Sequence, residues 1–303
     1  HELSGALHGL FRVRCFTQDD AHIFMTWDQM KDEIKNVVKL FDEVYSVFGL
    51  SYQIEVSTMP EDHMGDEKDW DFATETLKEA VSEMGKEYVI NEGDGAFYGP
   101  KIDLQIKDAL GREWQCGTIQ LDFQLPRNFD LKYTAQDGSE KVPVVIHRAI
   151  FGSIERFLGI IIENFKGVFP FWMSPYQVAV VPIRTEHNDY AKKVVQRLKA
   201  LRIRVEADYS DNNMKQKIKK FKNYKDPYIL VLGDKEAENG TVSINMRGSN
   251  KQINDVPLDK FIDMCMKLNM EQIEHEMKVI ADSGMEEILI LTGESRAQSN
   301  VEY

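Results

Sequence analysis

The chain has 303 residues and a net charge of −13 at pH 7, with 43% hydrophobic and 29% charged residues. That length predicts two domains, and that composition is typical of a soluble globular protein rather than a disordered one. No apolar run approaches the ~18 residues of a membrane span, and residues 1–9 carry no signal-peptide pattern. Three cysteines in a chain of this length do not make a disulfide framework. We therefore expect a cytoplasmic protein.

The acidic balance argues against a non-specific nucleic-acid binder, because phosphate contacts require Lys and Arg. One local exception exists, a basic run of six lysines within eleven residues: Lys215, Lys217, Lys219, Lys220, Lys222 and Lys225. Such a run is either a solvated helix face or a patch that contacts phosphates, and the pattern alone leaves both interpretations open.

The first part of the chain predicts an antiparallel sheet with helices. Alternation of Phe11, Val13 and Cys15 with their neighbours predicts a strand over 11–16, and a chain that opens inside a strand suggests a removed upstream segment. Apolar spacing predicts helices over 30–48, 68–84 and 153–165. Alternation predicts strands over 52–56, 102–106 and 114–123, with a hairpin turn at 109–112 between the last two.

The pattern changes at residues 169–175, where two prolines interrupt an aromatic segment and predict a domain border. The elements predicted beyond it are strand 177–182, helix 188–201, strand 203–207, basic helix 213–222, strands 228–232 and 241–246, and helix 258–268. This order indicates a small α/β domain built on βαβ units. We predict domains over 1–172 and 173–268, followed by an atypical extension over 269–303.

Four clusters of polar residues could carry chemistry. They are Arg12, Gln18, Asp19, Asp20 and His22; Tyr98, Gly99, Pro100 and Lys101; Gln115, Cys116, Gly117, Thr118 and Gln120; and His147, Arg148, Gly152, Ser153, Glu155 and Arg156. The histidines His22 and His147 are metal-ligand candidates without zinc-motif spacing, so ordinary surface or core histidines are the alternative. Arg156 lies in an apolar helical stripe and needs an anionic partner, either a ligand phosphate or a protein carboxylate.

These clusters resemble the motifs of the threonyl-tRNA synthetase family. Residues 1–22 resemble motif 2 of class II synthetases, residues 95–103 and 114–123 their central strands, and residues 144–156 motif 3. Gln-Asp-Asp-Ala-His combined with His-Arg-Ala separates this family from the prolyl and seryl enzymes. The resemblance covers residues 1–268 and implies mixed α/β and α+β classes: an antiparallel class II sheet with helices, then a small α/β anticodon-binding domain.

The resemblance implies an ATP-dependent threonine–tRNA ligase. Threonine attacks the α-phosphate of ATP to give threonyl-adenylate and pyrophosphate, and the threonyl group then passes to the 3′ end of tRNA(Thr). Because a hydrophobic pocket separates isosteres poorly, the family uses Zn²⁺ to bind the amino and hydroxyl groups of threonine. Mg²⁺ accompanies ATP, and editing of serine is a function of domains elsewhere in the family.

The resemblance also assigns roles by position. His22 and His147 match two zinc ligands, the third being a cysteine upstream of residue 1. Four residues match threonine contacts: Gln18, Asp20, Tyr98 and Gln120. Five match ATP contacts: Glu2, Arg12, Gln115, Ser153 and Arg156. Arg12, Lys101 and Arg156 are the implied catalytic residues, which would stabilise charge electrostatically.

Two family features would lie upstream of His1, namely the α-phosphate arginine of motif 2 and motif 1, which builds the dimer interface. The resemblance therefore implies impaired aminoacylation by this chain, and a homodimer for the full-length family. A non-catalytic tRNA-binding paralogue that keeps the scaffold is the alternative. The retained site residues favour the enzyme.

The second domain resembles the anticodon-binding domain of several class II synthetases. Lys217, Lys219 and Glu236 match residues that contact tRNA in the family. Two positions depart from the pattern, because Asn213 stands where the family often has a basic residue and Asn245 where it often has Arg. The expected contacts are therefore to the tRNA backbone more than to the bases.

The last residues depart from the family. Residues 271–303 predict a helix and then a strand, and they weakly resemble an early βα unit of a radical-SAM thiazole-biosynthesis tyrosine lyase. The cysteine motif that would hold an iron–sulfur cluster is absent from the sequence. A fused fragment and an ordinary terminal extension both remain open, and no function is assigned to this segment.

Overall fold

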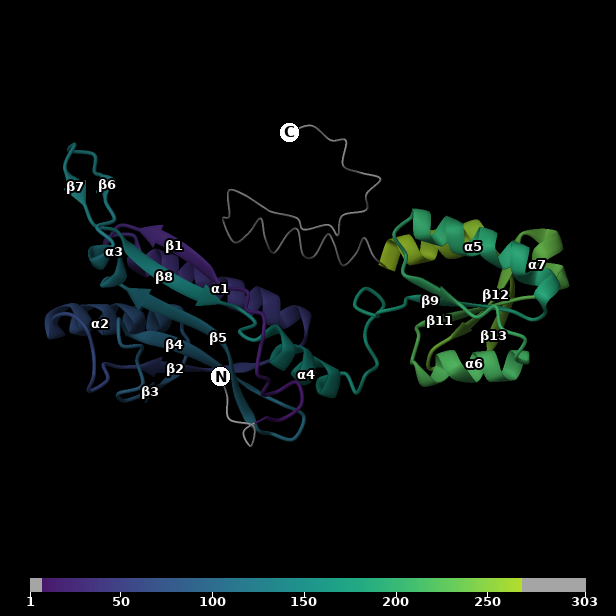
Figure 1. Ribbon diagram of the computed structural model, residues 1–303, viewed down its shortest axis with the longest axis horizontal. Coiled ribbons are helices and arrows are strands. Elements are labelled where there is room, and N and C mark those ends of the chain that lie inside the picture. Colours follow the sequence, from purple (N-terminus) through teal and green to yellow (C-terminus); the bar gives the residue numbers. More distant parts are fainter. Residues whose placement is uncertain (1–6, 269–303) are drawn as a thin grey trace. The chain divides into compact units, whose positions relative to one another are not determined.

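The computed structural model describes residues 7–268 (Figure 1). These residues form two compact units, which divide after Ile160. Among them no helix combines the length and the apolar character that crossing a membrane requires. The resemblance to a tyrosine lyase falls on residues outside this range. The domain borders inferred from the sequence pattern stay predictions.

The first unit is built on a six-stranded sheet. Its order is β1 (Ala21–Met25), β8 (Val144–Ala149), β5 (Glu113–Asp122), β4 (Lys101–Lys107), β2 (Tyr52–Ser57) and β3 (Tyr88–Asn91). Neighbouring strands are antiparallel except for the parallel pair β2–β3. A small hairpin of β6 (Tyr133–Thr134) and β7 (Glu140–Lys141) precedes β8. The predicted antiparallel sheet is confirmed.

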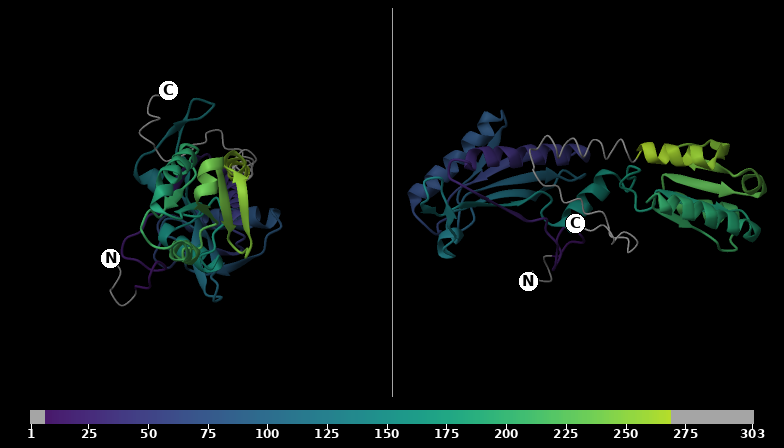
Figure 2. Two further views of the ribbon diagram at one scale, coloured as in Figure 1. Left: turned by 90° about the vertical axis from the view of Figure 1, so that its right-hand side faces the viewer. Right: turned by 90° about the horizontal axis from the view of Figure 1, so that it is seen from above.

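Two helices, α1 (Met30–Val47) and α2 (Glu67–Glu83), pack together over one face of this sheet (Figure 2). Alternation along the strands explains the layering: Ile102 and Leu104 are fully buried, whereas Lys101 and Asp103 point to the other face. The opposite face is therefore available for polar chemistry. The short helix α3 (Leu125–Asn128) follows β5, and α4 (Ile154–Asn164) follows β8.

The second unit contains a five-stranded sheet. Its order is β10 (Val205–Ala207), β9 (Val178–Pro182), β11 (Tyr228–Leu232), β12 (Thr241–Met246) and β13 (Gln252–Pro257). The first three strands are parallel, and β12 and β13 continue the sheet in antiparallel fashion. The helices between strands are α5 (Asn188–Ala200), α6 (Met214–Asn223) and α7 (Asp234–Asn239), with a 3₁₀ turn at Thr185–His187.

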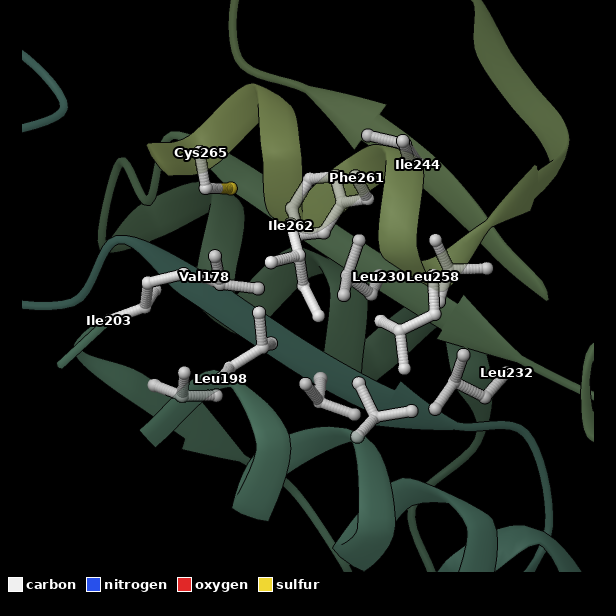
Figure 3. Close-up of a cluster of buried hydrophobic side chains, with 14 of the residues drawn as sticks. Val178, Leu198, Ile203, Leu230, Leu232, Ile244, Leu258, Phe261, Ile262 and Cys265 are labelled. Carbon is white, nitrogen blue, oxygen red and sulfur yellow. The ribbon is translucent and has the colours of Figure 1, made fainter. Parts of the chain in front are cut away.

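Helices cover both faces of the second sheet. Val178 and Val180 of β9 pack with α5 and with the helical residues 258–268, whereas Ala179 and Val181 pack with Phe221 of α6. Figure 3 shows the larger cluster, with side chains of sheet and helices meeting in one apolar layer. A strand buried on both faces explains why residues 178–181 are continuously apolar.

Several features differ from the sequence expectation. The predicted strand over 11–16 is wrong: His8 and Arg12 form only an isolated bridge in a tight turn, and the residues from Arg12 to Phe16 are largely exposed. Alternation alone does not make a strand where no neighbouring strand pairs with it. The strand β8, the hairpin strands β6 and β7, the helices α3 and α7, and the strands β3 and β13 were not predicted. The last two strands lie at sheet edges and lack a clear apolar alternation.

Candidate active site

A row of four polar side chains crosses the uncovered face of the first sheet. The register pairs Lys101 with Gln120, Gln120 with His147, and His147 with His22, on strands β4, β5, β8 and β1. Residues directly opposite one another point to the same face. The register therefore brings together four predicted site residues that lie up to 125 positions apart in the sequence.

The histidines lie at one end of this cross-strand row. The ring centroids of His22 and His147 are 4.7 Å apart, and the rings are nearly perpendicular. The ring of Tyr98 is 5.4 Å from that of His147, and its hydroxyl donates a hydrogen bond to Oε1 of Gln120. Burial, followed by the charges of Asp122 and Asp20, raises the pKa of Tyr98 to about 12. Tyr98 is therefore a neutral hydroxyl at physiological pH.

Asp122 forms a hydrogen bond with the ring of His147, a contact that the sequence did not predict. Its Oδ2 atom lies 2.8 Å from Nε2 of His147, and its Oδ1 atom accepts the backbone N–H groups of Gln124 and Leu125 at 3.0 and 2.9 Å. The residue is 1% exposed, so it is a fixed anchor. Because Nε2 is engaged, Nδ1 of His147 is the ring nitrogen available to a ligand. Its place two positions after Gln120, and so on the same face of β5, was the available sequence signal.

Lys101 is held at the other end of the row. Its Nζ atom lies 2.7 Å from Asp103 and 3.2 Å from Asp94. Burial acts to lower the pKa of Lys101, but these two ion pairs outweigh it and raise the pKa. The Nε2 group of Gln115 also donates to Asp103, at 2.6 Å. The buried carboxylate of Asp103 therefore orients two of the predicted site residues.

Arg156 extends along the same sheet from α4. Its Nε and Nη1 groups donate to the carbonyls of Phe11 and Gln115 at 3.0 and 2.9 Å, and its guanidinium lies 5.5 Å from the ring centroid of Trp114. These two partners are backbone carbonyls, so neither of the two anionic partners considered from the sequence is among them. The side chain is thereby fixed next to Gln115. Arg12 is exposed near the same segment.

Gln18 and Ser153 meet in an isolated bridge between the loop before β1 and the start of α4. Between them, Asp19 accepts the backbone N–H groups of Ile150, Phe151 and Gly152 at 2.8 to 3.1 Å. Asp19 thus fastens the turn that places Ser153 and Arg156, a supporting role that the sequence did not reveal. Asp20, the next residue, is exposed, and its charge acts on Tyr98.

The donor set fits part of a zinc site. His22 and His147 offer two imidazoles on adjacent strands, with Asp122 as the outer partner that a ligating histidine ordinarily has. Within residues 7–268, no group of three or more His, Cys, Asp or Glu side chains is arranged to hold a metal. The two histidines therefore supply two positions of a tetrahedral site.

The predicted tRNA contacts lie on the second unit and differ in exposure. Lys219 is exposed on α6, but Lys217 is 3% exposed and its Nζ atom donates to the carbonyl of Pro182 at 3.1 Å. Glu236 accepts hydrogen bonds from the N–H of Gly233 and the hydroxyl of Ser243. Lys217 and Glu236 thus hold the end of the sheet where β9 and β11 finish. Glu2, the remaining predicted contact, lies outside the described residues.

The two departures from the family pattern have local roles. Asn213 is the N-cap of α6. Its side-chain oxygen accepts the backbone N–H of Gln216 at 3.0 Å, and the side-chain oxygen of Gln216 accepts the backbone N–H of Asn213 at 3.2 Å. Asn245 donates to Gln252 across the β12–β13 pair at 3.2 Å. A basic residue at 213 would forgo this cap.

Comparisons with known proteins agree with this arrangement. The family model of the tRNA synthetase class II core domain (G, H, P, S and T) matches residues 1–165, and that of an anticodon binding domain matches residues 177–268. A threonine–tRNA ligase of Clostridium tetani is 56% identical over 271 residues, or 89% of this chain and 42% of the relative. The chain thus spans less than half the length of the curated relatives it matches.

Solved structures agree as well. The RNA binding domain of threonyl-tRNA synthetase from Cryptosporidium parvum is 42% identical, with a TM-score of 0.83 over 88% of this chain and 67% of that chain. Prolyl-tRNA synthetase from the same organism, at 16% identity and a TM-score of 0.59, shares the fold. Fold and site together define a class II aminoacyl-tRNA synthetase core with an anticodon-binding domain. Within that class, the chain belongs to the threonyl-tRNA synthetase family.

Proposed function

We propose that this protein acts in threonine–tRNA ligation and that the cross-strand row is its amino-acid pocket. The observation that carries the proposal is the register that aligns Lys101, Gln120, His147 and His22 on one uncovered face. Names of relatives at 52–56% identity support the same activity. ATP, threonine and tRNA(Thr) are the proposed partners, with a homodimer and a cytoplasmic location as in the family.

At the threonine end, Tyr98, Gln120 and Asp20 would contact the substrate. The neutral Tyr98 hydroxyl and the Gln120 amide are already oriented by their mutual hydrogen bond, so little order has to be created on binding. Asp20 would accept the threonine hydroxyl proton, and Gln18 would contact the carboxylate end. A site built to hydrogen-bond a hydroxyl rejects valine because buried polar groups would remain unpaired.

His22 and His147 are the residues that would hold Zn²⁺, with Asp122 orienting His147. The bound ion would supply Lewis-acid coordination for the amino and hydroxyl groups of threonine, which valine cannot complete. Both histidines must be neutral to ligate the ion.

At the ATP end, Arg12, Arg156, Gln115 and Ser153 would contact the nucleotide, with Mg²⁺ on its phosphates. The threonine carboxylate attacks the α-phosphorus, the bond to the bridging oxygen of the β-phosphate breaks, and pyrophosphate leaves. Arg156 is fixed by two carbonyls and would neutralise developing negative charge without reorganising. Lys101, kept protonated by Asp103 and Asp94, would do the same near the adenylate.

The second step transfers the threonyl group. The ribose hydroxyl of the terminal adenosine attacks the threonyl carbonyl, and AMP leaves. Lys219 of the basic helix would contact the tRNA backbone. Lys217, which is buried, would act through the position of α6, and Glu236 through the adjoining end of the sheet.

Titration calorimetry of the 303-residue protein with threonine, serine and valine tests the proposal directly. Threonine should bind more tightly than valine, and Gln120→Ala should weaken threonine binding. Threonine-dependent ATP–pyrophosphate exchange then separates an enzyme from a non-catalytic paralogue. Equal binding of threonine and valine would contradict the assignment of the pocket.

A further inference from the structure

Thr118 lies on the same face of β5 as the cross-strand row and has no role in the proposed function. It is two positions before Gln120 and so points to the same side of the sheet. The register places it opposite Asp103 on β4 and Ala149 on β8, and its side chain is half-buried. A hydroxyl can accept and donate at once, so at this place it can connect the polar residues on either side of it.

The Thr118 hydroxyl connects a carboxylate to the amide of Gln120. It donates to Oδ1 of Asp103 at 2.9 Å, and Nε2 of Gln120 donates to its oxygen at 3.4 Å. The other end of the Gln120 amide, Oε1, accepts the hydroxyl of Tyr98. The four side chains therefore form one continuous series of hydrogen bonds, which runs from the buried Asp103 to Tyr98.

The direction of these hydrogen bonds is set at the buried end. Asp103 is 1% exposed and its Oδ2 atom is 2.7 Å from Nζ of Lys101, so it is a carboxylate that can only accept. Thr118 must then donate to it, which leaves the Thr118 oxygen to accept an N–H group. Only the Nε2 side of the Gln120 amide can supply that group, so Oε1 turns to Tyr98.

This direction decides what Tyr98 can offer to a ligand. Its single phenolic hydrogen is used in the bond to Gln120, so the Tyr98 oxygen keeps only lone pairs for a further partner. The amino group of an amino acid carries N–H donors, which match such an acceptor. If the amide of Gln120 were turned over, the hydrogen of Tyr98 would be released and would oppose those N–H donors.

We propose that Thr118 is a positioning residue for amino-acid binding, which fixes the orientation of the Gln120 amide and thereby makes Tyr98 a hydrogen-bond acceptor for the substrate. Thr118 needs no contact with the substrate, because it acts through Gln120 and Tyr98. A network of this kind holds its members in one orientation while every link is present. The inference rests on the proposed function for the identity of the substrate as threonine.

Two substitutions of Thr118 separate this role from simple packing. Thr118→Val keeps the branched shape and removes the hydroxyl, whereas Thr118→Ser keeps the hydroxyl and removes a methyl group. Positioning predicts that Thr118→Val weakens threonine binding about tenfold, the value of one hydrogen bond, and that Thr118→Ser binds like the unchanged protein. Packing predicts the reverse order. Titration calorimetry of the 303-residue protein with threonine measures both affinities.

A double variant tests the path through Tyr98. Tyr98→Phe removes the proposed acceptor, so the addition of Thr118→Val should weaken threonine binding no further. Thr76→Val is the matched control for loss of a threonine hydroxyl. Thr76 is buried in α2 and donates to the carbonyl of Phe72 at 2.8 Å, on the covered face of the sheet, so this variant should bind threonine normally.

Threonine affinity that is unchanged in Thr118→Val, or weakened in Thr118→Ser, would overturn the proposal. The serine variant decides the matter by itself if the valine variant does not fold. Additive losses in the double variant would also overturn the proposal, because Thr118 would then not act through Tyr98. Any of these results in a protein that prefers threonine to valine would refute the role of Thr118 alone and leave the proposed function standing.

Discussion

At the scale of single residues, the candidate site depends on carboxylates that do not face a substrate. Asp122 fixes the ring of His147, Asp103 fixes Lys101 and Gln115, and Asp19 fixes the turn before α4. Each carboxylate is shared by several donors, which restrains the rotamers of the residues around it.

Asp122→Asn should leave the fold intact and weaken zinc retention. The asparagine keeps an oxygen for the N–H groups of Gln124 and Leu125, but it no longer holds His147 with a carboxylate. Loss of an outer partner of a ligating histidine typically costs about 10–100-fold in metal affinity. Competition with a chelator measures this, with His22→Ala as the variant that removes a ligand outright. Unchanged zinc affinity in Asp122→Asn would show that Asp122 is only structural.

At the scale of elements, the β4–β5 hairpin is closed by one carboxylate. Asp108 accepts the N–H groups of Leu110 and Arg112, the ring N–H of Trp114 and the guanidinium of Arg112. Burial alone would raise the pKa of Asp108, but the donors from Trp114 and Arg112 prevail and lower it to about 2. The ionised form is therefore more stable in the folded hairpin than in the unfolded chain.

This shift predicts acid sensitivity of the hairpin. A lowered carboxyl pKa contributes stability that is complete above about pH 4 and is lost as the pH falls towards 2. Because the turn lies at the surface, screening should hold the contribution to about 1 kcal/mol. Urea unfolding of the protein and of Asp108→Asn between pH 5 and 2 should give free-energy curves that converge as the pH falls. Parallel curves would assign the acid sensitivity to other carboxylates.

Just before β4 begins, the backbone at Gly99 lies very close to the backbone of β5, next to the cross-strand row. A Cβ atom on Gly99 would lie 1.9 Å from the carbonyl oxygen of Leu121, so Gly99→Ala must move β4 away from β5. We expect a loss near the upper end of ~1–3 kcal/mol in unfolding free energy, together with weaker threonine binding, since Tyr98 and Lys101 flank this site. Gly111→Ala is the control. An added Cβ atom at Gly111 would meet no neighbouring atom, so only the positive φ of 79° should cost unfolding free energy, about 1 kcal/mol. Equal losses of unfolding free energy in the two variants would mean that β4 and β5 can move apart without a large cost.

The sequence predicted most of the long elements well, because α1, α2, α4, α5 and α6 and strands such as β4 and β5 have strong apolar periods. It missed the central strand β8, and it missed the edge strands β3 and β13, whose residues are too exposed to show a period. The family motifs gave the candidate site residues, but not their alignment. Whether Lys101 and His22 share one row depends on strand register, which long-range pairing determines and local pattern does not. For the same reason the sequence did not single out Asp122, and it named Asp19 without its supporting role.

At the scale of the whole molecule, a net charge of −13 disfavours the approach of the proposed tRNA partner, which is a polyanion. Within the second unit, the helix α6 provides a local concentration of positive charge. Lys215 and Lys219 are exposed and, four positions apart, share one face, whereas Lys217 is buried and Lys220 pairs with Glu206 at 3.1 Å. Only part of the basic run is therefore available for phosphates.

The salt dependence of tRNA binding should report how many lysines contact phosphates. Each contact contributes about 0.7–0.9 to the slope of log affinity against log salt, so Lys215→Ala and Lys219→Ala should each reduce its magnitude by about one. Lys193→Ala is the matched control, because Lys193 is exposed on α5, which packs on the opposite face of the sheet from α6. Fluorescence anisotropy of a labelled threonine tRNA at several salt concentrations measures the slopes. If Lys193→Ala lowered the slope as much as Lys219→Ala, the tRNA would be attracted by overall charge and not by α6, and the basic run would be an ordinary solvated helix face.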